Sequence, residues 1–294
     1  MNGLLVIDKP GGMTSRDAVN CVQKWFPKKT KIGHTGTLDP LATGVLVVCI
    51  GLATRLADYV QAMGKSYSSR FRLGASSTSD DADGEVTETP NVFAPTRDQI
   101  DAAFATLTGS IEQMPPSVSA LKVGGRRAHD LARKGKDVPL VPRTVRIDVI
   151  RVLDYAWPWL EVEVDCGKGT YIRSIARDLG TALGCGGLVQ TLRRTRVGPF
   201  VAEQGVNVDA DPASVKLLPM TTVLAGMEQI RLSADEIRRL RQGQRITASG
   251  GRTTPDGSEI ALLDEKGELV GTCVVQGEQI VTQIMFAASL STIA

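Results

Sequence analysis

One acidic residue stands in a loop whose composition restricts its backbone. The stretch from Gly33 to Gly44 holds three glycines, three threonines, one carboxylate and one of the two histidines of the chain. The carboxylate is Asp39, which precedes Pro40 and is therefore biased towards an extended conformation. An acid on a rigid loop beside a buried strand is a common way to display a catalytic carboxylate. A turn cap is the alternative, and for an isolated Asp-Pro pair it is the commoner role.

A cation near a helix start is the second feature that could take part in chemistry. Thr170 is expected to cap a helix whose buried face includes Ile172 and Ile175, which places Arg173 in its first turn. Cations are normally stable at the other end of a helix, because the N-terminus attracts anions. A carboxylate or phosphate partner is therefore expected, and Asp39 is a candidate. An exposed Arg173 without such a partner is an equally good reading of the pattern alone.

Apolar patterning predicts the elements that position these residues. Residues 4–7 and 45–50 are expected as buried strands, and Thr14 or Ser15 is expected to cap the helix that follows the first. A strand at 65–73 places Tyr67, Phe71 and Leu73 on one face, although packing alone would also explain Tyr67. Further strands are expected at 119–123, 145–149, 160–166 and 188–197, and helices at 53–63, 96–107 and 126–135.

Composition excludes several classes of protein. The chain has 294 residues, of which 42% are hydrophobic and 22% charged, which is typical of a globular protein. No apolar run reaches the roughly 20 residues of a membrane span, and the N-terminus lacks the pattern of a signal peptide. Five cysteines without a C-x-x-C pair argue against disulfides and zinc, and favour a reducing, cytoplasmic compartment. Signatures of nucleotide cofactors, serine hydrolases and metalloproteases are absent from the sequence.

Charge is unevenly distributed, although the formal net charge is only +2. Residues 122–146 contain eight Lys or Arg against two acids, which suits local contact with a polyanion. Residues 80–88 hold five acids and no base, within a stretch, 76–90, that we expect to be a polar surface loop. A domain boundary is expected near Met227. Beyond it, the pattern predicts a small β-rich module with a helix at 233–242 and strands at 259–263, 269–275 and 279–286.

The motifs, taken together, resemble one family. Asp8-Lys9-Pro10 with Thr14-Ser15, and then the loop 33–44, resemble the first two motifs of the bacterial tRNA pseudouridine-55 synthases, the TruB family. The resemblance covers about residues 3–225, and the tail is similar to the small RNA-binding PUA-type module found at the C-terminus of this family. Later motifs match in the same order at Lys65-Ser66-Tyr67, Thr78–Gly84, Gly169–Arg173 and Leu192–Arg194.

The resemblance implies an α+β fold in residues 1–227, with a mixed, largely antiparallel sheet flanked by helices, and a PUA-type module in residues 228–294. It also implies the reaction. One uridine, at position 55 in the T-arm of tRNA, is flipped out, and its uracil is detached from ribose and rejoined through carbon 5. The implied partner is the T-arm stem-loop of tRNA. No cofactor, metal, nucleotide or membrane is implied, and we expect a cytoplasmic monomer.

Carried over by position, Asp39 is the nucleophile, Tyr67 stacks on the target base, and Arg173 is the ion-pair partner of Asp39. Whether Asp39 attacks carbon 6 of uracil or carbon 1 of ribose stays open. Extrusion of the base costs a few kcal/mol, and stacking returns about 1–3 kcal/mol. The further expected contacts with substrate or RNA are His34, beside the gap left by the flipped base, Leu192 in the uracil pocket, and Tyr171, Lys9, Arg126 and Arg133.

Two other functions stay open at this point. A non-catalytic RNA-binding or chaperone protein would need no carboxylate facing a polyanion. A carboxylate-based nucleoside or glycoside hydrolase would need a second acid as proton donor, and the candidates, Asp81 and Asp83, lie on a loop that we expect to be exposed. Three positions depart from the family pattern: Val118 and His129 stand where aromatic residues are frequent, and Arg55 stands where Lys is frequent.

Overall fold

A computed structural model describes residues 1–118, 140–247, 255–277 and 279–286, together with the backbone of residues 122–123 and 126–127. Most of the chain up to residue 201 is built on one large sheet. Its nine strands are β1 (Gly3–Lys9), β2 (Ile32–His34), β3 (Thr43–Ile50), β4 (Lys65–Leu73), β7 (Gly109–Gln113), β10 (Arg143–Ala156), β11 (Trp159–Cys166), β12 (Gly187–Val197) and β13 (Phe200–Val201).

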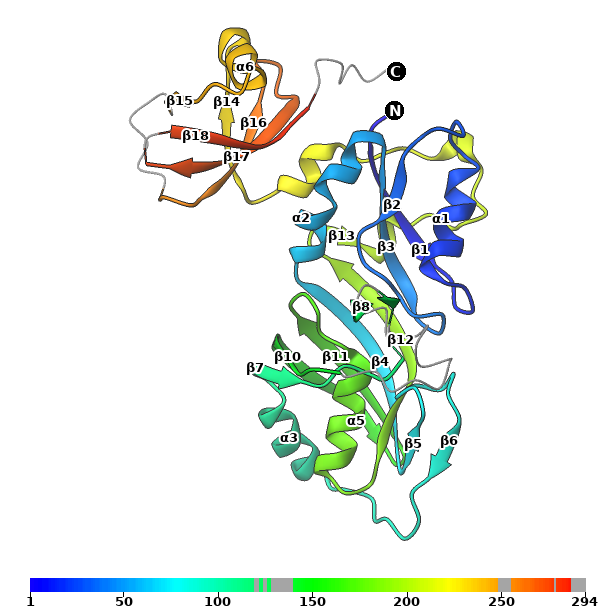
Figure 1. Cartoon of the computed structure of the whole chain (residues 1–294). Coiled ribbons are helices and arrows are strands. Elements are labelled where there is room, and N and C mark those ends of the chain that lie inside the picture. The colour runs from blue at the N-terminus through cyan, green and yellow to red at the C-terminus, as the bar shows by residue number, and fades with distance from the viewer. Residues whose placement is uncertain (119–121, 124–125, 128–139, 248–254, 278, 287–294) are drawn as a thin grey trace.

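The strand order of this sheet is β1-β3-β12-β4-β11-β10-β7, with β2 paired to β3 and β13 paired to β12 (Figure 1). The pairing of β3 with β12 is parallel, and the other pairings in the sheet are antiparallel. The expected mixed, largely antiparallel sheet is therefore confirmed. Because β3 and β12 are parallel neighbours in this sheet, segments far apart in the sequence meet there.

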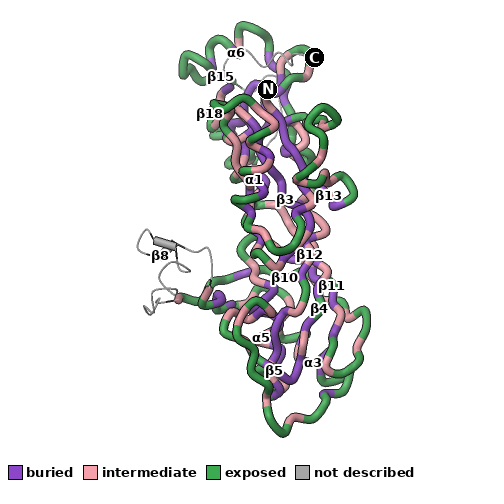
Figure 2. Tube along the Cα trace, turned by 90° about the vertical axis from the view of Figure 1, so that its right-hand side faces the viewer, coloured by how far each residue is buried: buried purple, intermediate pink, exposed green. Residues whose placement is uncertain are grey.

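Helices cover the sheet on both faces, so β3 is buried on both sides. Leu46, Val48 and Ile50 pack in the core under α1, α3 and α5, whereas Val45 and Cys49 pack in a second core on the opposite face. Figure 2 shows buried residues along the length of the sheet.

Of the described helices, none is long and apolar enough to cross a membrane. The helices are α1 (Ser15–Gln23), α2 (Ala57–Ala62), α3 (Arg97–Thr106) and α5 (Ile172–Ala182), with 3₁₀ helices η1 (Gly51–Leu56), η2 (Ala202–Gln204), η3 (Pro212–Ser214) and η4 (Met220–Leu224).

Among the helices that cover the large sheet, α1 and α3 begin with a side-chain cap and α5 does not. Thr14 caps α1 and forms a capping box with Asp17, and Thr96 caps α3 in the same way. The helix expected at 53–63 begins as the 3₁₀ helix η1 and becomes α-helical only in α2. Thr170 was predicted to cap α5, and this is wrong. The capping position is Tyr171, without a side-chain cap.

Two short hairpins correct other expectations. The stretch 76–90 was predicted to be a surface loop, but its ends pair as β5 (Ala75–Ser77) and β6 (Val86–Glu88). The helix predicted at 126–135 is wrong at its start, because β9 (Arg126–Arg127) pairs with β8 (Lys122–Val123). The rest of that predicted helix, and residues 119–121 of the strand predicted before it, lie outside the described residues.

The tail folds around a sheet of its own, as its apolar pattern predicted. Its strands follow the order β14-β16-β17-β18-β15, and a separate apolar core lies between this sheet and α6. Ser233 caps α6 and forms a capping box with Glu236. The elements are β14 (Glu228–Arg231), α6 (Ala234–Arg241), β15 (Ile246–Thr247), β16 (Glu259–Leu263), β17 (Leu269–Gln276) and β18 (Gln279–Met285).

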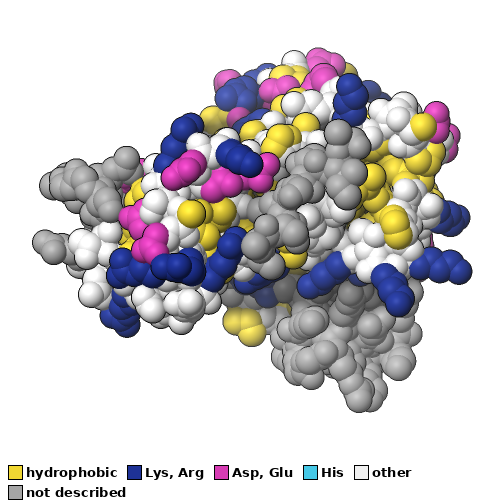
Figure 3. Space-filling view, turned by 90° about the horizontal axis from the view of Figure 1, so that it is seen from above, with side chains coloured by type: hydrophobic (Ala, Val, Ile, Leu, Met, Phe, Trp, Pro, Cys, Tyr) yellow, Lys and Arg dark blue, Asp and Glu magenta, His cyan; other side chains and the backbone are white. Residues whose placement is uncertain are grey.

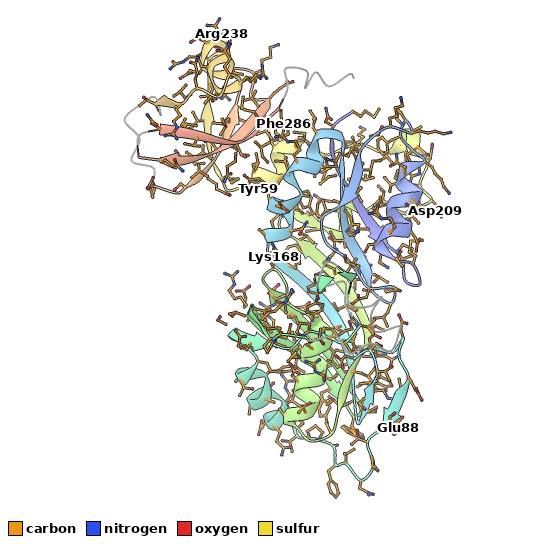
Figure 4. The ribbon with its side chains drawn as sticks, in the orientation of Figure 1. Tyr59, Glu88, Lys168, Asp209, Arg238 and Phe286 are labelled. Atoms are coloured by element: carbon orange, nitrogen blue, oxygen red, sulfur yellow. The ribbon has the colours of Figure 1, made fainter. Side chains whose placement is uncertain are left out.

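The tail sheet is packed against η1 and α2 rather than suspended from a linker. The Tyr59 hydroxyl lies 3.0 Å from the hydroxyl of Thr272 and 2.9 Å from Oε1 of Gln283. Phe286 is 1% exposed and lies in the same core as residues of β1 and β3, with the Arg55 guanidinium 5.4 Å from its ring centroid. Figure 4 shows Tyr59 and Phe286 at this junction. The two sheets therefore share part of one core.

Phe286→Ala should lower the free energy of unfolding by about 3–5 kcal/mol, because it leaves a cavity in this shared core. Urea denaturation followed by circular dichroism measures the change. Phe93→Ala is the matched control, because the Phe93 side chain is 92% exposed, so its removal should have little effect. A loss below about 1 kcal/mol for Phe286→Ala would contradict the shared core.

Candidate active site

The loop between β2 and β3 holds Asp39 in a fixed backbone. The Ser15 hydroxyl accepts a hydrogen bond from the Leu38 amide (2.7 Å) and donates one to the Leu38 carbonyl (3.0 Å). The amide of Gly12 donates to the carbonyl of Pro40, which follows Asp39 (2.9 Å). The turn between β1 and α1, together with the first residue of α1, therefore holds the two residues that flank Asp39. The rigidity expected from the composition of the loop comes largely from these contacts.

Lys9 supports the same loop from inside the protein. It was predicted to contact RNA, and this is wrong, because the residue is 0% exposed. Its ammonium donates to the carbonyls of Pro10 (2.8 Å), Met13 (2.8 Å) and Pro40 (3.3 Å). Burial lowers the pKa of the Lys9 ammonium to about 8. Lys9 thus ties the end of β1 to the residue next to Asp39.

The expected ion pair between Asp39 and Arg173 is present. Nε of Arg173 lies 3.0 Å from Oδ2 of Asp39, and Arg173 is 3% exposed. The same guanidinium donates to the carbonyls of Ser79 (2.8 Å) and Val118 (2.9 Å), so its position is fixed from several sides. The Asp39 side chain keeps 34% of its surface exposed, which leaves a carboxylate that a substrate can reach.

A second carboxylate, Asp81, shares Arg173. Oδ2 of Asp81 lies 3.3 Å from Nη1 of Arg173, and its Oδ1 accepts from the Ser79 hydroxyl (2.5 Å) and the Asp83 amide (3.2 Å). Asp81 was expected on an exposed loop, and this is wrong, because it is 4% exposed. The reason is a backbone bridge between Asp81 and Val189, which draws the acidic loop onto β12. No local sequence signal predicts such a long-range pairing.

Burial dominates the electrostatics at Asp39. It raises the pKa of the Asp39 carboxyl, the Arg173 guanidinium opposes this rise, and the negative charge of Asp81 adds to it. With both carboxylates ionised, Asp39, Asp81 and Arg173 together carry one net negative charge, because one guanidinium pairs with two carboxylates. A carboxylate that is partly desolvated and held by an arginine is poised as a nucleophile or a base.

Tyr67 and Leu192 stand on the face of the sheet that carries this cluster. They are 8% and 7% exposed and belong to the core under α1 and α5. Burial raises the pKa of the Tyr67 phenol, the nearby Arg194 guanidinium opposes this, and the charge of Asp39 contributes as well. The phenol therefore lies within electrostatic reach of Asp39, and the structure brings Tyr67 into the site.

Four further residues were predicted to contact substrate or RNA: His34, Tyr171, Arg126 and Arg133. His34 is half-buried on β2, opposite Val48. Tyr171 has its backbone amide and carbonyl bound by the side chain of Gln113 (2.8 and 3.0 Å), which fixes the start of α5. Arg126 lies on β9, where only the backbone is described, and Arg133, like His129, lies outside the described residues. Among the described side chains, no group of three or more His, Cys, Asp or Glu could hold a metal ion.

Two family models and several curated proteins match most of this chain. The N-terminal domain of TruB family pseudouridylate synthases matches residues 24–172, and the C-terminal domain of tRNA pseudouridylate synthase B matches residues 173–210. The tRNA pseudouridine synthase B of Arthrobacter sp. (strain FB24) is 43% identical over 288 residues, which cover 91% of this chain and 94% of the relative. That of Thermobifida fusca (strain YX) is 42% identical, with 90% of this chain and 95% of the relative covered.

Solved structures show the same fold. An H/ACA ribonucleoprotein bound to a substrate RNA containing 2'-deoxyuridine matches with a TM-score of 0.73 at 23% identity, covering 97% of this chain and 85% of that one. A Cbf5-Nop10-Gar1 complex matches with a TM-score of 0.72 at 25% identity, covering 97% of this chain and 84% of that one. With these relatives and this arrangement of Asp39, Arg173 and Tyr67, the chain belongs to the TruB family of pseudouridylate synthases.

Proposed function

We propose that the chain converts uridine to pseudouridine at position 55, in the T-arm of tRNA, with Asp39 as the nucleophile. One observation carries the proposal: a partly exposed Asp39 carboxylate is held by the buried guanidinium of Arg173, within electrostatic reach of Tyr67. The curated relatives at 43% and 42% identity, which are named tRNA pseudouridine synthase B, support the choice of substrate.

The reaction breaks the bond between N1 of uracil and carbon 1 of ribose, and forms a bond from carbon 5 of uracil to the same ribose carbon. The proton on carbon 5 is lost and N1 gains one, so the exchange is balanced and consumes no redox cofactor. Asp39 attacks carbon 6 of uracil or carbon 1 of ribose, and Tyr67 stacks on the flipped base. Arg173 keeps Asp39 ionised against the effect of burial.

A hydrolase would need a second acid that is free to donate a proton, and Asp81 does not meet this requirement. Asp81 lies close enough to be considered, but its Oδ2 pairs with Arg173 and its Oδ1 already accepts from Ser79 and Asp83. Neither oxygen is left to protonate a leaving group. Asp83 is exposed. The contacts of Asp81 therefore favour a structural and electrostatic role beside Arg173.

The direct test uses unmodified tRNA carrying tritium at carbon 5 of its uridines. The intact chain should release label from a single uridine, and a tRNA with cytidine at position 55 should release none. Binding without release would support a non-catalytic RNA-binding protein and overturn the proposal. Free uracil among the products would indicate a hydrolase, and release from the cytidine-55 tRNA would overturn the assigned position.

Asp81→Asn should shift the acid limb of the pH–rate profile to lower pH. Asp39 must be ionised to attack, its pKa is raised mainly by burial, and the charge of Asp81 raises it further. Removing that charge lowers the pKa of Asp39, so activity persists to lower pH. Single-turnover rates with prebound tRNA, measured between about pH 4 and 8, give the profile.

The control for this shift is Asp83→Asn, the same substitution at the exposed acid two positions further on. It should leave the acid limb where it is in the parent chain. A limb that stays in place in Asp81→Asn, or that moves to higher pH, would show that Asp81 does not act on the charge of Asp39. The absolute rate of Asp81→Asn is expected to fall as well, because Arg173 loses one of its fixed partners.

We also propose that residues 228–294 form an RNA-binding module of the PUA type. Its sheet and core are described above, and Lys and Arg side chains lie on its surface, mixed with acids, in the left-hand part of Figure 3. Within the described residues, Arg239 and Arg245 hydrogen-bond neutral amides, of Gln244 (3.3 Å) and Gln279 (3.2 Å). Their charges are therefore available to phosphate groups.

We propose further that the enzyme acts as a cytoplasmic monomer.

Replacing both Arg239 and Arg245 with Ser should weaken tRNA binding and reduce its salt dependence. Each lost phosphate contact lowers the slope of log K against log salt by about one. Filter binding at several salt concentrations measures both effects. Arg97→Ser is the control, because Arg97 is exposed on α3 and already paired with Asp101 at 2.8 Å. An unchanged slope in the double variant would contradict RNA binding by these arginines.

A further inference from the structure

A second buried arginine, Arg194 on β12, contacts the segment 33–45, here called the Asp39 loop, on both sides of Asp39. Its Nε donates to the carbonyl of Val45 (2.8 Å), and its Nη2 donates to that of Gly36 (3.1 Å). Its Nη1 lies 3.5 Å from the carbonyl of Thr37. Arg194 is 3% exposed, so these contacts are shielded from water. One guanidinium thus joins the residues before Asp39 to those after it.

The backbone around Arg194 is built for close approach. In the parallel pairing of β12 with β3, Arg194 lies opposite Gly44. A Cβ on Gly44 would lie 2.2 Å from the Arg194 carbonyl oxygen, and the residue has φ +97°, a conformation that favours glycine. The last glycine of the Asp39 loop is therefore needed where the loop meets Arg194.

Arg194 also faces the strand of Tyr67. In the antiparallel pairing of β12 with β4, Arg194 lies opposite Tyr67, and directly opposed residues project on the same face of a sheet. The guanidinium lies close enough to the phenol of Tyr67 to oppose the rise of its pKa caused by burial. The side chain of Arg194 thus links the loop that carries Asp39 with the ring expected to stack on the target base.

The charge of Arg194 has no carboxylate partner among the described residues. Its neighbours differ, since Arg193 pairs with Asp8 (2.8 Å) and Arg196 with Asp165 (3.6 Å). A buried cation costs free energy unless polar groups replace its water. At Arg194 these groups are three backbone carbonyls of the Asp39 loop, and the Tyr67 phenol lies beside them. This arrangement indicates that Arg194 acts on the site and not only on packing.

We propose that Arg194 is a positioning residue for the isomerisation, fixing the Asp39 loop and the Tyr67 phenol relative to each other. The proposal rests on the proposed function and deepens it. Arg194 acts through these two groups and does not touch the reacting atoms itself. Lys would keep the charge at this point, but its single ammonium cannot reach the three carbonyls and the phenol together.

The test is the single-turnover rate of Arg194→Lys with prebound tRNA, together with the tRNA dissociation constant. A misplacement of about 1 Å costs about 100-fold in rate, so we expect a loss of this size with an affinity within about threefold of the parent. Hydrogen exchange of the peptide covering residues 33–45 should increase in the free protein. The parent chain in the same assay tests the proposed function, so failure of that function is seen separately.

Arg193→Lys is the matched control, the same substitution one position earlier, at a pair whose side chains are 41% and 29% exposed. Its rate should change by less than about fivefold. If Arg194→Lys folds poorly, Arg194→Gln provides the second variant, and hydrogen exchange is read below its melting temperature. A rate within about threefold of the parent, or a loss explained by affinity alone, would overturn the proposal.

A double-mutant cycle with Tyr67→Phe tests the link to the phenol. If Arg194 acts partly through the Tyr67 hydroxyl, Arg194→Lys should lower the rate by a clearly smaller factor in the Tyr67→Phe chain than in the parent. The same factor in both chains would show that Arg194 acts on the loop alone, and would overturn the Tyr67 half of the proposal.

Discussion

Asp39→Asn should abolish tritium release from tRNA, lowering the single-turnover rate by about 10⁴-fold or more. Asn has nearly the same shape as Asp but lacks the charge needed to attack an electron-poor carbon. Affinity for tRNA should persist, because the phosphate contacts that we propose, Arg239 and Arg245, lie in the tail module. Residual activity at a tenth of the parent rate would remove Asp39 from the role of nucleophile.

The same substitution should leave the fold as stable as before, or more stable, at neutral pH. Burial raises the pKa of Asp39 above its ordinary value of 3.8, so the ionised carboxylate is destabilising in the folded state. Asn removes this cost, and Arg173 keeps Asp81 as a partner. The gain is fully present above the folded-state pKa of Asp39 and disappears as the pH falls towards 3.8. Thermal melts of parent and variant at several pH values measure it, and a clearly lower melting temperature at pH 7 would contradict it.

Arg173→Lys should lose at least about 100-fold in rate while tRNA still binds. The guanidinium of Arg173 contacts two carboxylates, at 3.0 and 3.3 Å, and two backbone carbonyls. A lysine ammonium cannot make all of these contacts from one position, so Asp39 would be left less firmly held and harder to ionise. Single-turnover rates and filter binding separate the two effects.

Arg177→Lys, one turn further along α5, is the control for this loss. Arg177 pairs with Asp80 and Asp178, both at 2.9 Å, and is not in contact with Asp39. Its rate should fall by less than about tenfold. Near-parent turnover in Arg173→Lys, or an equal loss in both variants, would show that the pair with Asp39 is not required.

The sequence predicted the parts of the site that depend on local pattern. Thr14 as a cap, β3 as a buried strand, and the loop that presents Asp39 all follow from residue type and spacing. The position of Arg173 at a helix start made Asp39 one candidate partner, with an exposed arginine as an equal alternative. The resemblance to the family assigned the pair, and the structure contains it. The resemblance to the family then assigned roles that the pattern alone had left open.

Contacts between segments that are distant in the sequence could not be predicted from local pattern. Lys9 reads as a loop lysine available to RNA, yet tertiary packing turns its ammonium towards three carbonyls. Asp81 reads as one of several surface acids, yet its bridge with Val189 buries it beside Arg173. In the same way, Arg194 is one arginine among three in β12, and only the strand register distinguishes it from its neighbours.

The parallel pairing of β3 with β12 has a consequence for folding. The contact between Arg194 and Val45 joins residues 149 positions apart, and the contact between Arg173 and Ser79 joins residues 94 apart. Closing loops of this length costs entropy before any contact repays it, so such pairings form slowly. During refolding, strands and helices should therefore form well before turnover returns. Recovery of activity would then report the moment at which β3 and β12 pair.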